Sequence, residues 1–230
     1  MSEPRVLLIT GASGGIGEAV ARRAVADGWR VALAARRADA LTALSDELGG
    51  AEVALPVATD VTEWDQVEAM AATVRERMGG IHAVFANAGF GATRGFTEET
   101  PEHWRSMILT NVYGAAITIR ATFEDLKAAE GHLILTGSIA GKVALPGSVY
   151  SSTKWAVAGM AESARRQMTE HGVKVTLLNP GAVDTDFFDS EPDFPVVSAS
   201  DVAEAVAFAL SRPPHVAINE ITLRPTLQET

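Results

Sequence analysis

The chain has 230 residues, of which 47% are hydrophobic and 21% charged; this is the composition of an ordinary globular protein, and the length fits one domain over residues 1–230. The formal net charge of −10 argues against a nucleic acid or an anionic membrane surface as the main partner. The chain has no cysteine, which excludes disulfides and thiolate metal sites.

Short apolar runs alternate with longer helical patterns along the chain. In order, the sequence predicts strands over Arg5–Thr10, Arg30–Ala35, Glu52–Ala58, His82–Ala86, Gly131–Thr136, Lys174–Asn179 and His215–Thr222. Between them it predicts helices over Ile16–Asp27, Asp39–Leu48, Glu63–Met78, Pro101–Leu126, Val149–Glu170 and Asp201–Ser211. Strict alternation is typical of parallel sheets, so we expect an α/β fold with a doubly wound sheet of seven parallel strands and helices on both faces.

Local signals mark some of the connections. Thr62 is a candidate helix cap, Thr100 followed by Pro101 marks another helix start, and Gly28 is suited to a helix end. The least regular stretch, residues 184–200, contains two prolines, clustered acids and three phenylalanines. It follows the sixth predicted strand, and ligands of such sheets bind beyond the carboxyl ends of the strands, so we expect a substrate loop there.

The first predicted strand runs into the sequence TGASGGIG, residues 10–17, and then into a helix. Glycines in this place permit a tight turn and the close approach of a pyrophosphate to N–H groups at the helix start. The spacing departs from G-x-G-x-x-G, and a tight connection without a ligand also fits the pattern.

Tyr150 and Lys154 lie four positions apart in the sequence YSSTK, at the start of a predicted helix. This spacing brings two side chains onto one helix face. An ammonium beside a phenol favours phenolate, so we expect the pKa of Tyr150 to fall from about 10 toward the working pH, as general acid/base chemistry requires. Taken alone, such a pair is more often an ordinary surface pair of an amphipathic helix.

Further motifs follow the glycine loop in a fixed order. They are NAG at Asn87–Gly89, Asn111 in the fourth predicted helix, Ser138 after the fifth strand, YSSTK twelve residues later and NPGAVDT at Asn179–Thr185. In order and approximate spacing this series resembles that of the short-chain dehydrogenase/reductase family. The ending AINEITLRPTLQET resembles a subgroup of NADP-dependent 3-hydroxy acid or serine dehydrogenase-like members.

The resemblance implies a single-domain Rossmann fold and an NAD(P)-dependent oxidoreductase that interconverts an alcohol and a ketone or aldehyde. By this analogy Tyr150 is the general acid/base, Lys154 lowers its pKa and holds the nicotinamide ribose, and Ser138 hydrogen-bonds the substrate carbonyl. Asn111 would interrupt its helix to hold a water that links Lys154 to solvent. The resemblance also implies a homo-oligomer, a tetramer or a dimer. A non-catalytic NADP(H)-binding sensor is the alternative, although such a protein is expected to lack part of this tetrad.

The same resemblance implies a set of residues around the dinucleotide. These are Gly11, Gly15, Ile16 and Gly17 at the pyrophosphate, Asp60 and Val61 at the adenine, Asn87 and Gly89 on the adenosine side, and Pro180, Gly181, Val183 and Thr185 at the nicotinamide carboxamide, with Tyr150 and Lys154 at its ribose. Asp60 fits equally well as a residue at a helix start. Candidates for the substrate pocket are Ser138, Tyr150, Phe90, Val143, Leu145, Phe187 and Phe188, and the apolar ones also suit a core.

The choice of dinucleotide depends on the end of the second predicted strand. An NAD site usually has Asp or Glu there to bind the ribose 2′-hydroxyl, and this chain has Ala35. Arg36 follows and can bind a 2′-phosphate through its planar guanidinium, with Arg37 as a second candidate and Ser13 as a hydroxyl donor. We therefore expect NADP(H) to be preferred over NAD(H). The arginines also fit solvated residues at a helix start.

The sequence lacks the patterns that would indicate a metal site, a membrane span or an export signal. The five histidines are scattered without ligand spacing and are expected to be surface or cap residues, so we expect no metal. No apolar run approaches membrane-spanning length, and the first residues lack a charged leader and cleavage site. We expect a soluble, cytoplasmic protein whose partner is a small-molecule substrate.

Overall fold

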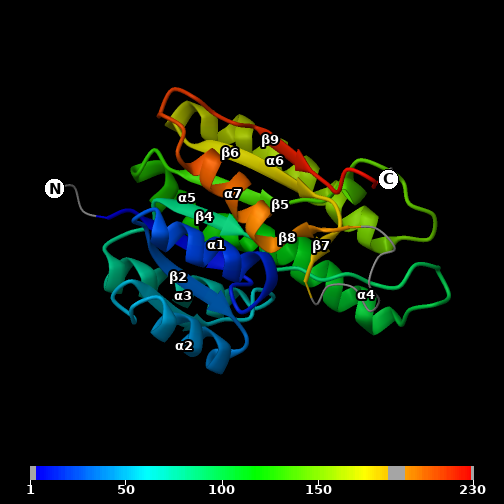
Figure 1. Ribbon diagram of the computed structural model, residues 1–230, viewed down its shortest axis with the longest axis horizontal. Coiled ribbons are helices and arrows are strands. Elements are labelled where there is room, and N and C mark those ends of the chain that lie inside the picture. The colour runs from blue at the N-terminus through cyan, green and yellow to red at the C-terminus, as the bar shows by residue number, and fades with distance from the viewer. Residues whose placement is uncertain (1–3, 186–194, 229–230) are drawn as a thin grey trace.

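The computed structural model describes residues 4–185 and 195–228, and its central element is a sheet of seven parallel strands (Figure 1). The strands are β1 (Val6–Thr10), β2 (Arg30–Ala35), β3 (Ala54–Ala58), β4 (Ala83–Ala86), β5 (His132–Thr136), β6 (Lys174–Pro180) and β9 (Glu220–Leu223). Their order is β3-β2-β1-β4-β5-β6-β9, and all neighbouring pairs are parallel. The expected doubly wound α/β fold is confirmed.

Seven α-helices are present among the described residues. They are α1 (Gly15–Ala26), α2 (Ala38–Glu47), α3 (Trp64–Met78), α4 (Pro101–Ile108), α5 (Ala115–Ala128), α6 (Val149–Met168) and α7 (Ala199–Leu210). One hydrophobic core joins the sheet to α3, α5 and α6, and a second joins its other face to α1, α2 and α7. All five residues of β1 are buried, because helices cover both faces of a parallel sheet.

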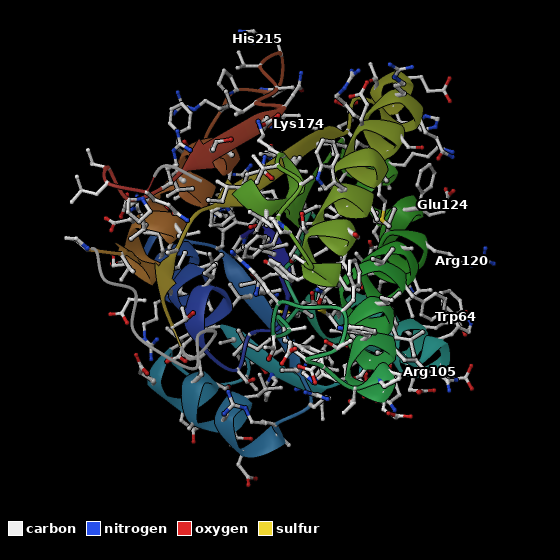
Figure 2. The ribbon with its side chains drawn as sticks, turned by 90° about the vertical axis from the view of Figure 1, so that its right-hand side faces the viewer. Trp64, Arg105, Arg120, Glu124, Lys174 and His215 are labelled. Atoms are coloured by element: carbon white, nitrogen blue, oxygen red, sulfur yellow. The ribbon has the colours of Figure 1, made fainter. Side chains whose placement is uncertain are left out.

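Charged side chains lie on the outer surface of the helices α3, α4 and α5 (Figure 2). The labelled Trp64, Arg105, Arg120 and Glu124 lie on the side of α3, α4 and α5 that faces away from the sheet. The guanidinium carbon of Arg120 lies 5.2 Å from the centre of the Trp64 ring, in a cation–π contact. Arg120 therefore covers Trp64, which is half-buried and packs against the first core.

The helix expected over Pro101–Leu126 is divided into α4, a π-helical turn over Leu109–Gly114 and α5. Its start is as expected, since the Thr100 hydroxyl accepts the N–H of His103 at 3.1 Å and proline occupies the first turn. The π-helical turn widens the backbone at Asn111. The interruption of the helix at this residue is therefore confirmed.

Two expectations near β3 are wrong. The strand begins at Ala54 and not at Glu52, because the residues before it form a turn after two glycines. Thr62 does not cap α3, whose first turn follows Glu63 without a side-chain cap. The Thr62 hydroxyl instead donates to the carboxylate of Asp60 at 2.8 Å.

The last strand is also shorter than the prediction over His215–Thr222. It begins at Glu220, because Pro213 opens a turn in which its carbonyl accepts the N–H of Val216 at 3.0 Å. The hydrophobic run that suggested a longer strand lies mostly in the connection that leads into β9. The strand itself pairs with the carboxyl half of β6.

Part of the predicted loop 184–200 is regular structure. β7 (Val183–Asp184) pairs with β8 (Val197–Ser198), and α7 begins directly afterwards. A capping box fixes this helix start, since the Ser198 hydroxyl accepts the N–H of Asp201 and the Asp201 carboxylate accepts the N–H of Ser198. The carboxyl ends of the strands, at the right of Figure 1, are therefore flanked by this pair and by α4.

Candidate functional site

A cavity of about 1100 Å³ opens at the carboxyl edge of the sheet. Among the residues nominated from the sequence, it is lined by Gly11, Ser13, Gly15, Ile16, Arg36, Arg37, Asp60, Val61, Asn87, Gly89, Phe90, Ser138, Val143, Leu145, Tyr150, Lys154, Pro180, Gly181, Val183 and Thr185. Gly17 and Asn111 do not line it. Phe187 and Phe188 lie outside the described residues.

The glycine loop requires glycine at several positions, because a side chain there would strain the backbone or clash with neighbouring atoms. Gly11 and Gly15 have φ values of +68° and +53°, in the left-handed region that favours glycine. A Cβ on Gly11 would lie 2.9 Å from the Cα of Ala88, and a Cβ on Gly15 would lie 3.1 Å from Cγ2 of Thr185. Gly17 serves packing instead, because a Cβ there would collide with the carbonyl oxygen of Gly11.

The start of α1 faces this loop without a side-chain cap. Gly14 is the N-cap residue, and the next two residues, Gly15 and Ile16, line the cavity. The first N–H groups of a helix have no partner inside the helix, and they carry the positive end of its dipole. This helix start is therefore suited to an anionic group such as a pyrophosphate.

Two arginines stand beside the glycine loop, after Ala35 at the end of β2. The guanidinium of Arg37 donates to the carbonyl oxygen of Ser13 at 2.7 Å and to its hydroxyl at 3.3 Å. Arg36 is exposed, lines the cavity and forms no ion pair with any described residue. The structure thus brings together the three residues that the sequence nominated for a 2′-phosphate.

Asp60 and Val61 line the next part of the cavity. One carboxylate oxygen of Asp60 accepts the N–H of Thr62 at 2.9 Å, so Asp60 also holds the turn before α3, as the alternative reading expected. Val61 is 6% exposed and packs against the π-helical turn, where a Cβ on Gly114 would lie 2.8 Å from its Cγ2. Both residues therefore combine a structural contact with a place in the cavity wall.

Asn87 connects the ends of three strands. Its N–H donates to the hydroxyl of Thr10 at 3.0 Å, and its side-chain oxygen accepts the hydroxyl of Thr136 at 3.1 Å. These bonds join β4 to β1 and β5 where the cavity begins. The spacing between the glycine loop and the Ser138 segment is fixed in this way.

Tyr150 lies in the first turn of α6, and its phenol is hydrogen-bonded to the side chain of Ser138. Burial raises the pKa of Tyr150 to about 12, and the hydrogen bond to Ser138 opposes this rise only in part. The expected fall of this pKa is therefore wrong for the structure described. At neutral pH the phenol carries its proton.

Lys154 is 4% exposed, and its Nζ donates to the carbonyl oxygen of Thr136 at 2.8 Å. The same Nζ lies 5.7 Å from the centre of the Tyr150 ring. Burial lowers the pKa of Lys154 to about 8, since a buried ammonium loses its hydration. The two groups are neighbours, as the helical spacing predicted. Desolvation favours the neutral form of each, so it raises the pKa of Tyr150 and lowers that of Lys154.

Asn111 lies behind the cavity wall. Its side-chain oxygen accepts the N–H of Phe90 at 3.0 Å, and its NH₂ group donates to the Phe90 carbonyl at 2.9 Å and to the Thr153 hydroxyl at 3.1 Å. It therefore supports the segment after β4 from behind and contacts the residue next to Lys154.

Val143 and Leu145 form an apolar part of the wall beside Tyr150. The carbonyl oxygen of Val143 accepts the Ser151 hydroxyl at 2.8 Å and the indole N–H of Trp155 at 3.3 Å. Two side chains of α6 therefore hold this wall in place, and neither was singled out in the sequence.

A further part of the wall comes from residues 90–103, which follow the NAG motif after β4 and of which the sequence suggested only Phe90. The rings of Phe90 and His103 meet edge to face, with centroids 5.3 Å apart. The His103 ring bonds the carbonyl of Gly91 through Nε2 at 2.9 Å, and Glu99 and Arg94 add charged groups to the same wall. Arg94, Glu99 and His103 belong to no local sequence motif. Sequence reasoning missed them because only the fold brings them to the cavity.

The loop after β6 is held by a residue near the carboxyl end of the chain. The side-chain oxygen of Gln228 accepts the N–H of Ala182 at 2.9 Å, and Gln228 lines the cavity. The carbonyl of Leu223 accepts the N–H of Gly181 at 2.8 Å. The sequence offered no signal for Gln228.

The cavity residues fit a dinucleotide. Glycines leave room where a Cβ would clash, an uncapped helix start faces the cavity, and two guanidiniums stand beside it.

In the part of the chain that the structure describes, no cluster of three metal-ligating side chains is found. His132 corrects one expectation, since it is 3% exposed and bonds the Thr176 hydroxyl at 2.7 Å. No helix within residues 4–185 and 195–228 is long and apolar enough to cross a membrane.

Comparison with known proteins agrees with this geometry. Residues 5–194 match the family model described as short chain dehydrogenase. An uncharacterised oxidoreductase of Staphylococcus aureus is 36% identical over 225 residues, which cover 96% of this chain and 97% of the relative. An alcohol dehydrogenase from the archaeon Thermococcus sibiricus, complexed with 5-hydroxy-NADP, is 34% identical with a TM-score of 0.92 and 99% of each chain covered. The closed form of serine dehydrogenase complexed with NADP⁺ is 29% identical with a TM-score of 0.92, covering 98% of this chain and 96% of that one.

Replacing Lys154 by methionine tests the burial of its ammonium. The pKa of this lysine is about 8 in the folded chain and 10.5 in the unfolded one, so the unfolded chain binds more protons between these pH values. The destabilisation from the buried charge is complete below pH 8 and disappears as the pH rises to 10.5. We expect the free energy of unfolding of nucleotide-free wild type, minus that of Lys154→Met, to rise by about 3 kcal/mol over this range. Urea unfolding measures it, and a constant difference would contradict the prediction.

Proposed function

Because this oxidoreductase belongs to the short-chain dehydrogenase family, we propose that it interconverts an alcohol and a ketone or aldehyde with NADP(H), and that Tyr150 moves the proton. The observation that supports the proposal best is the meeting of Ser138, Tyr150 and Lys154 at one cavity that also contains the glycine loop and two arginines. A non-catalytic sensor needs no proton donor there, so this arrangement favours the enzyme.

In the reductive direction the Tyr150 phenol donates its proton to the substrate oxygen. The raised pKa of Tyr150 keeps the phenol protonated at neutral pH, which is the form that this step requires. The hydroxyl of Ser138 donates a second hydrogen bond to the same oxygen, where negative charge develops. The nicotinamide, when bound, supplies or accepts the hydride at the carbon.

Lys154 and Asn111 act around this pair. The Lys154 ammonium, held by the carbonyl of Thr136, lies beside the Tyr150 ring and stabilises negative charge on the phenolate left after proton transfer. Its position also suits a hydrogen bond to the nicotinamide ribose. Asn111 holds the Phe90 backbone, and with it one wall of the cavity.

The preference for NADP(H) rests on the end of β2. Ala35 offers no carboxylate that would repel a 2′-phosphate, and Arg36 has no ion pair among the described residues to compete for its guanidinium. Arg37, bonded to Ser13, adds positive charge at the same edge. The neighbouring structures bound to NADP analogues or NADP⁺ support the same choice.

Replacing Tyr150 by phenylalanine removes the proposed proton donor with little change in shape. We expect wild type to oxidise NADPH with at least one member of a panel of ketones, aldehydes and keto acids, and the variant to lose about 10²- to 10⁴-fold in kcat. Binding of NADPH, measured by nucleotide fluorescence, should stay close to that of wild type. A variant with most of its activity would refute the role of Tyr150, and a wild type inactive on every compound would favour the sensor.

Replacing Arg36 by alanine tests the cofactor preference. A charge-assisted contact contributes roughly 1.5 to 3 kcal/mol, so wild type should prefer NADPH over NADH by about one to two orders of magnitude in kcat/KM, and the variant should lose most of this preference. Arg77 is the matched control, since it is exposed on α3 and has no ion pair among the described residues. The hypothesis fails if wild type prefers NADH, or if Arg36→Ala and Arg77→Ala behave alike.

We propose that the protein forms a tetramer or a dimer. Ile108, Tyr113 and Trp155 expose 44%, 42% and 52% of their surface on α4, the π-helical turn and α6, and apolar side chains of this size gain from a partner. Light scattering at micromolar concentration should give a molecular mass of four or two times the 24.2 kDa of one chain. The mass of a monomer would contradict the prediction.

A further inference from the structure

The turn after β5, which carries Ser138, is held at both ends. The N–H of Ser138 donates to the side-chain oxygen of Asn179 at 3.1 Å, and its carbonyl accepts the N–H of Gly141 at 2.9 Å. The turn ends at Lys142, whose N–H donates to the carbonyl of Ile139 at 2.9 Å. The place of the Ser138 hydroxyl therefore depends on Asn179 at one end of the turn and on Lys142 at the other.

Glu220, the first residue of β9, contacts both of these anchors. Its Oε1 accepts a hydrogen bond from the NH₂ group of Asn179 at 3.0 Å and forms an ion pair with Nζ of Lys142. The hydroxyl of Thr222 donates to the same oxygen at 3.1 Å. The Lys142 ammonium, with the Thr222 hydroxyl and the Asn179 amide, holds the pKa of Glu220 below its usual range. Glu220 is therefore a carboxylate at neutral pH.

The carboxylate decides which way the Asn179 amide faces. An ionised carboxylate only accepts hydrogen bonds, so it binds the NH₂ group, and the amide oxygen then points to the N–H of Ser138. Asn179 is 1% exposed, so in the folded chain its amide bonds to protein groups, whereas the side chain of Glu220 is 41% exposed. With the amide reversed, two donors would face each other at Ser138 and two acceptors at Glu220.

We propose that Glu220 is a positioning residue that holds the Ser138 turn in the geometry in which the Ser138 hydroxyl meets Tyr150. Glu220 does not line the cavity, so it acts through Asn179 and Lys142. The inference rests on the proposed function, because it concerns the hydroxyl that binds the substrate oxygen there. It extends the site from the cavity wall to the edge strand of the sheet.

Four variants test the contacts of Glu220 with Asn179 and Lys142. Glu220→Ala removes both of these contacts together with the one to Thr222, Glu220→Gln keeps an acceptor oxygen for Asn179, Lys142→Met removes only the ion pair, and Glu162→Gln is the control. Glu162 also pairs with basic side chains, Arg165 and Arg166, but away from the cavity on α6. We expect Glu220→Ala to lose about tenfold in kcat with the Kd for NADPH unchanged, because small displacements of a reacting group slow chemistry more than binding. Glu220→Gln and Lys142→Met should lose less, and Glu162→Gln nothing.

A double-mutant cycle with Ser138→Ala tells positioning from general destabilisation. If Glu220 acts through the Ser138 hydroxyl, Glu220→Ala should cost almost nothing further in kcat once that hydroxyl is absent. A merely structural role would lower kcat by the same factor in both backgrounds. Equal losses in the two backgrounds, or a Glu220→Ala variant with wild-type kcat, would overturn the proposal.

Hydrogen exchange of the peptide that spans residues 137–143 reports on the turn without any chemistry. We expect faster exchange in Glu220→Ala than in wild type, and no change in Glu162→Gln. If wild type reduces no carbonyl compound, the proposed function fails and the catalytic part of this inference fails with it, but faster exchange still identifies Glu220 as the anchor. Unchanged exchange in Glu220→Ala would overturn the anchoring itself.

Discussion

The buried ammonium of Lys154 constrains everything around it. A charge with so little access to water is stable only with a well-placed acceptor, and the carbonyl of Thr136 at the end of β5 provides one. Helix α6 must therefore be positioned along the sheet so that Lys154 reaches the carbonyl of Thr136. One turn earlier, the same register brings Tyr150 to Ser138, and it lets Ser151 bond the backbone that carries Val143.

Features with a local cause could be read from the sequence. The inner strands of the sheet are short and mostly buried, so they appear as apolar runs, and β1 is buried from end to end. Gly11 and Gly15 have positive φ values, a backbone that other residues rarely adopt, so their place in a turn is visible in the sequence. Tyr150 and Lys154 are neighbours because a helix makes four positions one face.

Features that depend on distant partners could not be read in this way. The pKa of Tyr150 rises because the fold buries the phenol, and a helical spacing carries no information on burial. Gly17 looks like part of the phosphate cradle, but its lack of a side chain is required by the carbonyl of Gly11 behind it. Glu220 begins a strand whose start the sequence misplaced, and its contact with Asn179 joins residues 41 positions apart.

The bond between Gln228 and Ala182 has a practical side. The chain returns to the cavity at Gln228, whereas the residues before β1 lie at the amino ends of the strands, away from the cavity (Figure 1). A bulky label attached next to Gln228 would therefore disturb the loop after β6 at the cavity. A label for immobilisation or biosensing is better attached to the residues before β1, at the amino ends of the strands and away from the cavity (Figure 1).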